Sequence, residues 1–179
     1  QDDLNLFRNV EGCEKYHIPY GIYLYSYAKN IEGSNELNIN SESVSSEISH
    51  ILRLLDELNE LGYHPNLKTK VFYDMEEDSS ISLGRETLTN MADIFCKELE
   101  ESGYTCGIYA NKYWLTSNLN VSYLNEKYDI WLAEWHNGIS NYEDASKISP
   151  TYQNTNYDIW QFSSYGIIPG ISGYVDLDL

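Results

Sequence analysis

Helical and strand-like hydrophobic patterns alternate along the first two thirds of the chain. Three segments have the mix of apolar and polar residues typical of helices, near residues 2–16, 41–61 and 83–102. Each is followed by a short apolar or alternating segment that predicts a β-strand, at 20–28, 71–74 and 104–111. Because parallel strands need a crossover connection, this order predicts a parallel sheet or barrel with helices outside it.

The two longer helices each have one apolar face. We expect the following residues to pack that face against the outside of the sheet: Ile48, Leu52, Leu55, Met91, Phe95 and Leu99. The last third of the chain differs, since the strands predicted at 128–135 and 157–164 have only a polar loop between them. No linker or low-complexity segment divides the sequence, which therefore predicts one α/β domain over residues 1–179.

Polar side chains follow the predicted strands at the points where they end. These residues are Asp74 with Glu76, Asn111, Glu134, and Asp176 with Asp178 in the closing "GYVDLDL". In parallel α/β folds the carboxyl ends of the strands meet at one rim, where functional sites collect. We therefore expect these side chains to surround one site.

The stretch "KVFYDMEEDSS" places a pair of carboxylates directly after a buried strand pattern. Asp74 and Glu76 are two residues apart, so on a strand they point the same way with Cα atoms about 6.6 Å apart. Hydrolysis of a glycosidic bond needs one carboxyl group that stays protonated and one that stays ionised. Two like charges in close proximity raise the pKa of one of them, which provides that difference.

Composition narrows the range of partners. Eleven basic and 28 acidic residues give a net charge of −17, which argues against nucleic acid or an anionic membrane as the main partner. No run of 18 apolar residues is present, and the opening "QDDLNLF" has no signal-peptide pattern. Seventeen Tyr and four Trp favour rings that line a wet groove and suit sugar faces, although Tyr-rich strands also pack well.

Other chemistries fit less well. An EF-hand calcium loop beginning at Asp74 would need Gly at Ser79 and Glu at Arg85, so only incidental Mg²⁺ or Ca²⁺ binding stays open. The four histidines have no metal-ligand spacing, and "GISGY" is not a nucleophile elbow. We expect no cofactor and no dedicated metal site.

The three cysteines, Cys13, Cys96 and Cys106, form no CxxC motif, and their odd number argues against a full disulfide framework. A bridge between Cys96 and Cys106 stays open, but buried free thiols are the favoured interpretation.

Several stretches occur in the same order as the motifs of one enzyme family. They are "YGIYLYSYA", "VFYDMEE", "GIYANKYWL", "DIWLAEW" and the long closing "DIWQFSSYGIIPGISGYVDLDL", which together run from Tyr20 to the end of the chain. In these motifs the chain resembles the family 25 glycoside hydrolases, the Chalaropsis-type lysozymes that cleave peptidoglycan. The resemblance implies an irregular TIM-like (β/α)5(β)3 barrel. The family also begins with two strands, one of them carrying a catalytic Asp, that have no counterpart here, so we expect them upstream of residue 1.

The resemblance also implies roles for individual residues. Glu76 matches the family's proton donor, Asp74 the neighbouring acid, and Asp176 the carboxylate of the last strand. Further residues fall on strands that line the substrate groove: Tyr23, Tyr25, Tyr109, Trp131, Glu134 and Gln161. For the aromatic residues among them, packing inside the barrel stays an open alternative.

The implied activity is hydrolysis of the β-1,4 bond between N-acetylmuramic acid and N-acetylglucosamine, with bacterial peptidoglycan as partner and an extracellular or cell-wall location. Two alternatives stay open. One is an inactive relative that only binds the cell wall, and the other is a glycosidase of the same barrel class that acts on another polysaccharide such as chitin. The sequence leaves the oligomeric state undetermined.

Overall fold

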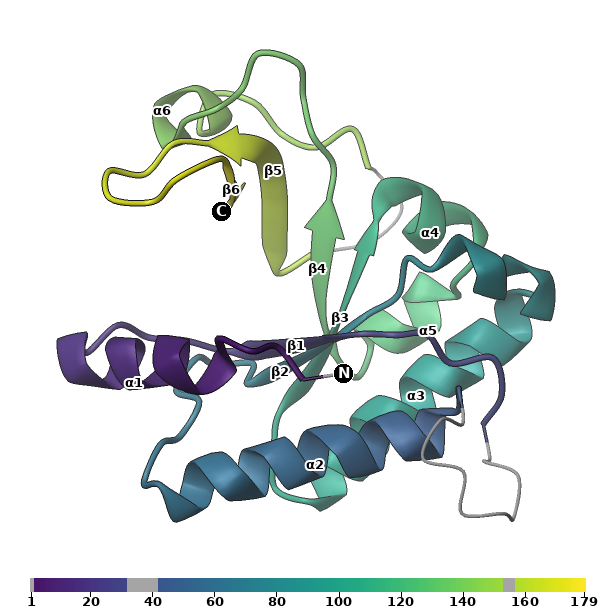
Figure 1. The fold of residues 1–179 in the computed structure, drawn as a ribbon. Coiled ribbons are helices and arrows are strands. Elements are labelled where there is room, and N and C mark those ends of the chain that lie inside the picture. The colour runs from purple at the N-terminus through teal and green to yellow at the C-terminus, as the bar shows by residue number, and fades with distance from the viewer. Residues whose placement is uncertain (1, 32–41, 153–156) are drawn as a thin grey trace.

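Six strands form a single sheet in the computed structural model, which describes residues 2–31, 42–152 and 157–179. They lie in chain order across the sheet: β1 (Ile22–Tyr25), β2 (Val71–Asp74), β3 (Cys106–Asn111), β4 (Asp129–Ala133), β5 (Ile159–Gly166) and β6 (Val175–Asp178). The first five run parallel, and β6 runs antiparallel to β5. In Figure 1 the sheet curls from β1, seen edge-on, to β5 and β6 at the top.

The described residues include the helices α1 (Leu6–Tyr16), α2 (Val44–Glu60), α3 (Arg85–Glu101), α4 (Lys112–Ser117), α5 (Val121–Asn125) and α6 (Tyr142–Ala145), with a 3₁₀ helix η1 (Asp78–Leu83) before α3. Of these, α2 and α3 cover the convex side of the curled sheet, while α1 lies beside its β1 edge. The two long helices, α2 and α3, lie below β1 and β2 in Figure 1. The alternation of helix and strand predicted from the sequence is therefore confirmed.

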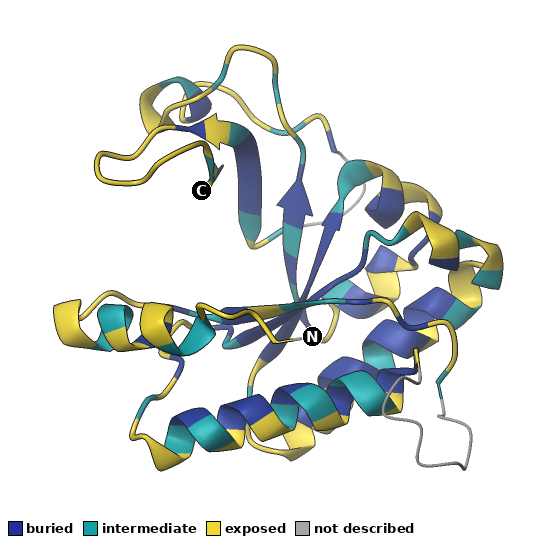
Figure 2. Cartoon of the chain, viewed as in Figure 1, coloured by how far each residue is buried: buried dark blue, intermediate teal, exposed yellow. Residues whose placement is uncertain are grey.

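The predicted apolar faces of α2 and α3 form the main core. Of the six side chains named above, five are buried and Leu52 is partly buried against them. The Tyr73 ring of β2 stacks on Phe95 of α3, with centroids 3.9 Å apart and planes at 8°. Figure 2 shows buried residues running through β4 and β5, while the loop that joins β5 to β6 is exposed.

A second, smaller cluster fills the concave face of the sheet. It consists of Phe72, Tyr109 and Ala133, with Trp131 and Ile159 packed against them. Trp131 meets the rings of Phe72 and Tyr109 edge-on, at centroid distances of 5.0 and 4.8 Å. These contacts form because residues in register on parallel strands point to the same face of the sheet.

A half-buried carboxylate fixes the end of β1 to the convex side. Glu47 of α2 accepts hydrogen bonds from the Tyr27 backbone N–H at 2.7 Å, the Tyr73 hydroxyl at 2.6 Å and the Ser26 hydroxyl at 3.1 Å. Burial raises the pKa of Glu47, and these donors oppose that rise. The network holds β1 beside β2, and so positions Tyr25 at the edge of the concave face.

Some element boundaries differ from those predicted. The strand expected at 20–28 has ladder pairing only over Ile22–Tyr25, because it pairs on one side only among the described residues. The helix expected from 41 begins at Val44 after the Ser43 cap, and position 41 lies outside the described residues. The helices α4, α5 and α6 were not predicted, since four to six residues are too few to show a helical period.

The closing strand corrects one expectation. Asp176 and Asp178 were expected at the end of a strand that reaches the common rim. Because β6 is antiparallel, it is the start of the strand, near Val175, that lies beyond the ends of β3 and β4, while Asp178 pairs with Gln161 at the rim. The pattern of the last strand carries no signal for its direction, which depends on the hairpin it forms with β5.

The closed (β/α)5(β)3 barrel is not seen in the part of the chain that the structure describes, where the sheet stays open beside β1. The expectation of two strands before residue 1 stays a prediction.

All three cysteines are free, and the favoured interpretation of buried free thiols is confirmed for Cys96 and Cys106, while Cys13 is only partly buried. The Sγ atoms of Cys96 on α3 and Cys106 on β3 lie 2.8 Å apart in the buried core.

Replacing Gly107 should destabilise the concave core. A Cβ atom at this position would lie 2.6 Å from Cε1 of Phe72 and 2.8 Å from the backbone oxygen of Asp129. We expect Gly107→Ala to lower the free energy of unfolding by about 1–3 kcal/mol, the usual cost of overpacking, measured by chemical denaturation.

The matched control is Gly12→Ala in α1, where an added Cβ meets nothing within 4 Å. That change should leave stability equal or higher, because Ala favours helix more than Gly does. A Gly107→Ala variant as stable as the wild type would contradict the packing described for the concave face.

Candidate active site

The carboxylate of Asp74 lies at the end of a strand that is buried on both faces. Register aligns Tyr25, Asp74, Tyr109 and Trp131 across four neighbouring strands, so all four share the concave face. Asp74 is only 5% exposed, and its Oδ1 atom has no hydrogen-bond partner among the described residues. An unpaired buried carboxyl oxygen is costly, which is typical of a functional position.

Glu76 lies just beyond the end of β2 and is half-buried. The hydrogen-bond ladder continues past the strand, because the Met75 backbone N–H donates to the Tyr109 oxygen at 2.9 Å. This brings Glu76 beside Asn111, the last residue of β3, whose side-chain Nδ2 donates to Oε2 of Glu76 at 3.5 Å. Glu76 is therefore both anchored by one donor and accessible to a ligand.

Burial and like charges keep a proton on this pair of carboxyl groups near neutral pH. Burial, aided by the charge of Glu76, raises the pKa of Asp74 to about 8. Burial also raises the pKa of Glu76, with the Asp176 and Asp78 charges adding to the rise and the Asn111 hydrogen bond opposing it. Near neutral pH the proton is therefore retained above all on Asp74.

Asp176 belongs to the same electrostatic cluster. Burial is the largest cause that raises the pKa values of Tyr109 and Tyr23. The charges of Asp74, Glu76 and Asp176 raise both pKa values further, so both tyrosines sense all three carboxyl groups. The structure thus brings the three carboxyl groups predicted from the sequence around one region of the concave face. Asp176 itself is exposed, whereas Glu76 is half-buried and Asp74 is buried.

Asp178 is a residue whose contribution the sequence argument underestimated. Its Oδ1 accepts a hydrogen bond from Nε1 of Trp131 at 2.7 Å, which fixes the indole on the concave face. Burial, and to a smaller extent the charge of Asp176, raises the pKa of Asp178 to about 6, although the Trp131 hydrogen bond opposes this. The D-x-D spacing in "VDLDL" was the available signal, because residues two apart share a strand face.

Several of the predicted groove residues are held by one another. The buried Gln161 accepts from the Tyr109 hydroxyl at 3.1 Å and from Nε1 of Trp135 at 2.9 Å, both through Oε1. Tyr25 is half-buried and donates to Glu77 at 3.4 Å, while Tyr23 is 62% exposed. The rings of Tyr23, Tyr25 and Trp131 remain at least partly accessible to a ligand.

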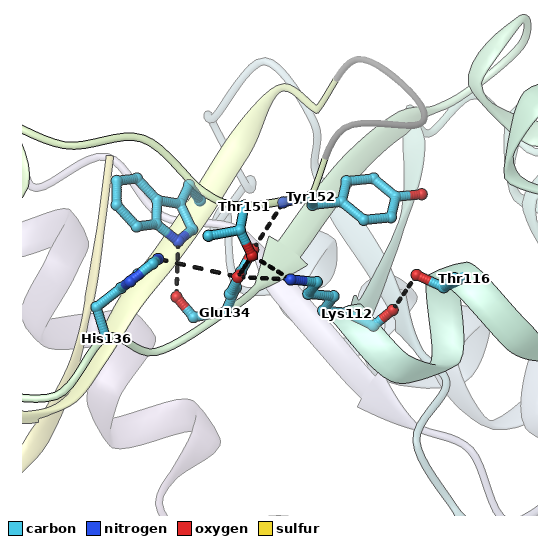
Figure 3. Close-up of polar contacts among 7 residues, drawn as sticks. Lys112, Thr116, Glu134, His136, Thr151 and Tyr152 are labelled. Atoms are coloured by element: carbon cyan, nitrogen blue, oxygen red, sulfur yellow. Dashed lines mark hydrogen bonds and ion pairs between the residues drawn. The ribbon is translucent and has the colours of Figure 1, made fainter.

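The carboxylate of Glu134 is engaged with protein donors (Figure 3). Nζ of Lys112 lies 2.9 Å from Oε1, the Thr151 hydroxyl donates to the same oxygen, and the Tyr152 backbone N–H donates to Oε2 at 3.1 Å. Burial would raise the pKa of Glu134, but these donors together outweigh it and lower the pKa. This network ties the end of β4 to residues 151–152, and the predicted sugar contact of Glu134 stays a prediction.

The hairpin formed by β5, β6 and the loop between them has no charged residue before Asp176. No charged residue occurs between Asp158 and Asp176, although the chain as a whole is 22% charged. The hairpin exposes Tyr165, Ile167, Ile171 and Tyr174, and the two tyrosine rings meet edge-on at 5.5 Å. The sequence argument did not single out these residues, although the uncharged stretch was visible in it.

Two absences concern the described ranges 2–31, 42–152 and 157–179. Within them, no three His, Cys, Asp or Glu side chains are grouped so that they could hold a metal ion. None of their helices has the length and apolar character needed to cross a membrane.

The raised pKa of Asp74 predicts how stability depends on pH. Because the folded state keeps a proton that the unfolded state loses near the ordinary value of 3.8, the free energy of unfolding should fall as pH rises from about 4 to about 8. Asp74→Asn cannot ionise, so it should remove much of this fall and be more stable than the wild type at pH 9 by a few kcal/mol.

Urea denaturation of both proteins at pH 4, 6, 8 and 9 measures this difference. Asp56→Asn, at an exposed position of α2, is the control and should follow the wild type at every pH. Parallel curves for wild type and Asp74→Asn would contradict the buried, proton-retaining state of Asp74.

Comparison with solved structures shows the fold. The catalytic domain of endolysin ply40 from bacteriophage P40 of Listeria monocytogenes is 23% identical with a TM-score of 0.71, over 99% of this chain and 75% of that chain. The Clostridium perfringens spore cortex lytic enzyme SleM is 20% identical with a TM-score of 0.71, over 99% of this chain and 54% of that chain. The modular Cpl-1 endolysin is 17% identical with a TM-score of 0.50, over 84% of this chain and 38% of that chain.

This chain therefore spans about half the length of SleM and three quarters of the ply40 domain. No curated protein matches it significantly. The sequence model of glycosyl hydrolases family 25 matches residues 8–171. Because that match covers most of the chain, this chain belongs to glycosyl hydrolase family 25.

Proposed function

We propose that this protein hydrolyses the β-1,4 bond between N-acetylmuramic acid and N-acetylglucosamine in bacterial peptidoglycan, outside the cell or in the cell wall. The observation that carries the proposal is the carboxyl pair at the end of β2. Asp74 is buried with an unpaired oxygen, Glu76 is accessible beside it, and the pKa values of both are raised. Carboxyl groups with these properties are the usual machinery of glycoside hydrolysis.

The similar structures support the substrate class. They are described as endolysins and a spore cortex lytic enzyme, and the Cpl-1 endolysin was solved in complex with a peptidoglycan analogue. An acidic protein would be repelled by anionic wall polymers, so the aromatic side chains of the groove would supply most of the binding energy.

Glu76 is the proposed proton donor. It is less buried than Asp74, so it can reach the glycosidic oxygen, and burial raises its pKa. Transfer of its proton lets the leaving sugar depart as an alcohol while positive charge develops on the other sugar ring. Asp176 would stabilise that charge, and protonated Asp74 would steer the substrate. Water then adds at the anomeric carbon and gives up a proton to the Glu76 carboxylate, which restores the acid. The resemblance to the family implies net retention, through either the acetamido group of the substrate or a carboxylate.

The rings on the concave face are the proposed sugar-binding surface. The partly accessible Trp131 is fixed by a hydrogen bond to Asp178, while the buried Tyr109, fixed by Gln161, packs against it as support. Rings held in this way lose little conformational entropy when a sugar packs on them, which favours binding. Tyr23 and Tyr25 would extend the surface along β1.

For the full-length domain we propose the closed (β/α)5(β)3 barrel of the family. The outer edge of β1 has no strand partner among the described residues, and a groove of about 650 Å³ runs along it between α1 and α2. Its apolar lining includes Leu6, Val10, Ile51 and Leu54. Parallel sheets rarely leave such an edge open, so a further strand would fit there. The open edge is also what favours the alternative of a relative that binds the wall without cleaving it.

The decisive variant is Glu76→Gln, which keeps size and polarity but removes the transferable proton. General acid catalysis typically contributes about 10²–10⁴-fold, so the full-length protein should lose most of its lytic activity by such a factor. The measurement is loss of turbidity of purified peptidoglycan, with the new reducing ends identified by mass spectrometry as muramic acid.

The control is Asp56→Asn on the outer face of α2, which should keep wild-type activity. Full activity in Glu76→Gln would refute the mechanism, and new reducing ends on glucosamine would show that a different bond is cleaved. A full-length wild-type protein that binds peptidoglycan without releasing reducing ends would favour the binding alternative.

A further inference from the structure

The side-chain amide of Asn111 contacts both Glu76, the proposed acid, and the first turn of α4. Asn111 is the last residue of β3 and also the N-cap of α4, so no loop separates the strand from the helix. Its Oδ1 accepts from the Trp114 backbone N–H at 3.1 Å, and its Nδ2 donates to Oε2 of Glu76 at 3.5 Å. We propose, on the basis of the function assigned above, that Asn111 is a positioning residue that fixes which oxygen of Glu76 carries the transferable proton.

The cap decides the orientation of the amide. At an N-cap the side-chain oxygen satisfies a free backbone N–H of the first helical turn, and Asn111 has the extended backbone (φ −71°, ψ 162°) that this role requires. The oxygen must face Trp114, because a backbone N–H needs an acceptor. The NH₂ group therefore has to be at the other end of the amide, directed at Glu76, and the usual ambiguity between amide N and O is removed.

The framework around Asn111 is rigid on both sides. Trp114 is only 1% exposed and anchors the first turn of α4 in the main core. On the strand side, Asn111 pairs in register with Ala133 of the neighbouring β4. Because the helical turn after Asn111 and the strand beside it are both fixed, the Asn111 amide cannot move with the Glu76 carboxyl group if that group rotates.

The consequence for Glu76 is a distinction between its two oxygens. Oε2 accepts a hydrogen bond from the Asn111 amide. A proton on Oε2 would either collide with the amide hydrogen or break that hydrogen bond. The transferable proton is therefore held on Oε1, the oxygen away from Asn111 and free for a ligand. A general acid whose proton is already on the correct oxygen needs no rotation before transfer, which is a form of preorganisation.

Two charged groups act on Glu76 in the opposite direction. They are Asp176 of β6 and Asp78 of η1, whose charges disfavour ionisation of Glu76, as burial does. Asp74 of β2 and the hydroxyls of Tyr23, Tyr25 and Tyr109 also lie close enough to sense the charge of Glu76, and no described Lys, Arg or His shifts the Glu76 pKa. The hydrogen bond from the Asn111 amide stabilises the ionised form of Glu76, and so it limits the rise of the Glu76 pKa.

Two substitutions separate the cap from the contact with Glu76. Ser and Asp are both good N-cap residues, so Asn111→Ser and Asn111→Asp should keep α4 folded while removing the NH₂ donor. Asn141 is the matched control, because it caps α6 through the same type of bond, from Oδ1 to the Asp144 N–H at 2.9 Å, and belongs to a different part of the fold. Asn141→Ser should change neither Glu76 nor activity.

The first readout is the Glu76 titration, followed by carbon-13 NMR of the labelled glutamate carboxyl groups and assigned by the signal missing in Glu76→Gln. We expect the pKa of Glu76 to rise by up to about one unit in Asn111→Ser, the usual worth of one hydrogen bond to a charged group, and further in Asn111→Asp, which adds a like charge. Thermal unfolding of both variants should stay close to that of the wild type.

The second readout is the pH dependence of kcat on peptidoglycan. Its alkaline limb should move to higher pH in both Asn111 variants, with kcat about tenfold lower at the wild-type optimum because the proton is no longer held on one oxygen. A purely structural role of Asn111 would lower the unfolding temperature and leave this limb where it is.

The outcomes separate this inference from the proposed function. If Glu76 titrates at the wild-type value in both folded Asn111 variants, the inference is overturned, whatever the activity. If Glu76→Gln is inactive but the Asn111 variants keep the wild-type pH profile, the inference fails while the proposed function stands. If Glu76→Gln is fully active, the proposed function fails, and the proton-positioning role of Asn111 fails with it.

Discussion

The burial of one carboxyl group at the end of a fully buried strand is the constraint on which the rest of the site depends. β2 has apolar neighbours on both faces, yet its last residue is Asp74, whose Oδ1 has no partner among the described residues. Such a group is tolerated mainly in its protonated form. It therefore keeps a proton beside Glu76, where a glycosidase needs one, at a cost to stability that increases with pH.

Two hydrophobic cores, one on each face of the sheet, hold the carboxyl groups in place. On the convex side, α2 and α3 bury the apolar faces of β1 to β4, and Glu47 fixes the end of β1. On the concave side, Phe72, Tyr109 and Trp131 form a small aromatic cluster that supports the carboxylates from below. Gly107 is needed because a larger residue would collide with Phe72.

Much of this arrangement follows from the sequence. Helical spacing identified the buried faces of α2 and α3, and the abrupt change from Val71–Tyr73 to Asp74 and Glu76 pointed to the candidate site, because charge after a buried strand needs a reason. The direction of β6, the donors around Glu134 and the double contact of Asn111 could not be predicted. Each depends on which distant segments meet in space, such as residues 151–152 with Glu134, and no local pattern encodes that meeting.

The pH dependence of kcat/KM on soluble peptidoglycan glycan tests the central claim most directly, because it reports the protonation of the free enzyme's essential acid. If Glu76 in the carboxyl pair at the end of β2 supplies the proton, activity should persist above the ordinary carboxyl range and fall only as pH rises through its raised pKa. A profile whose alkaline limb lies near pH 4, as for an unperturbed carboxylate, would contradict it.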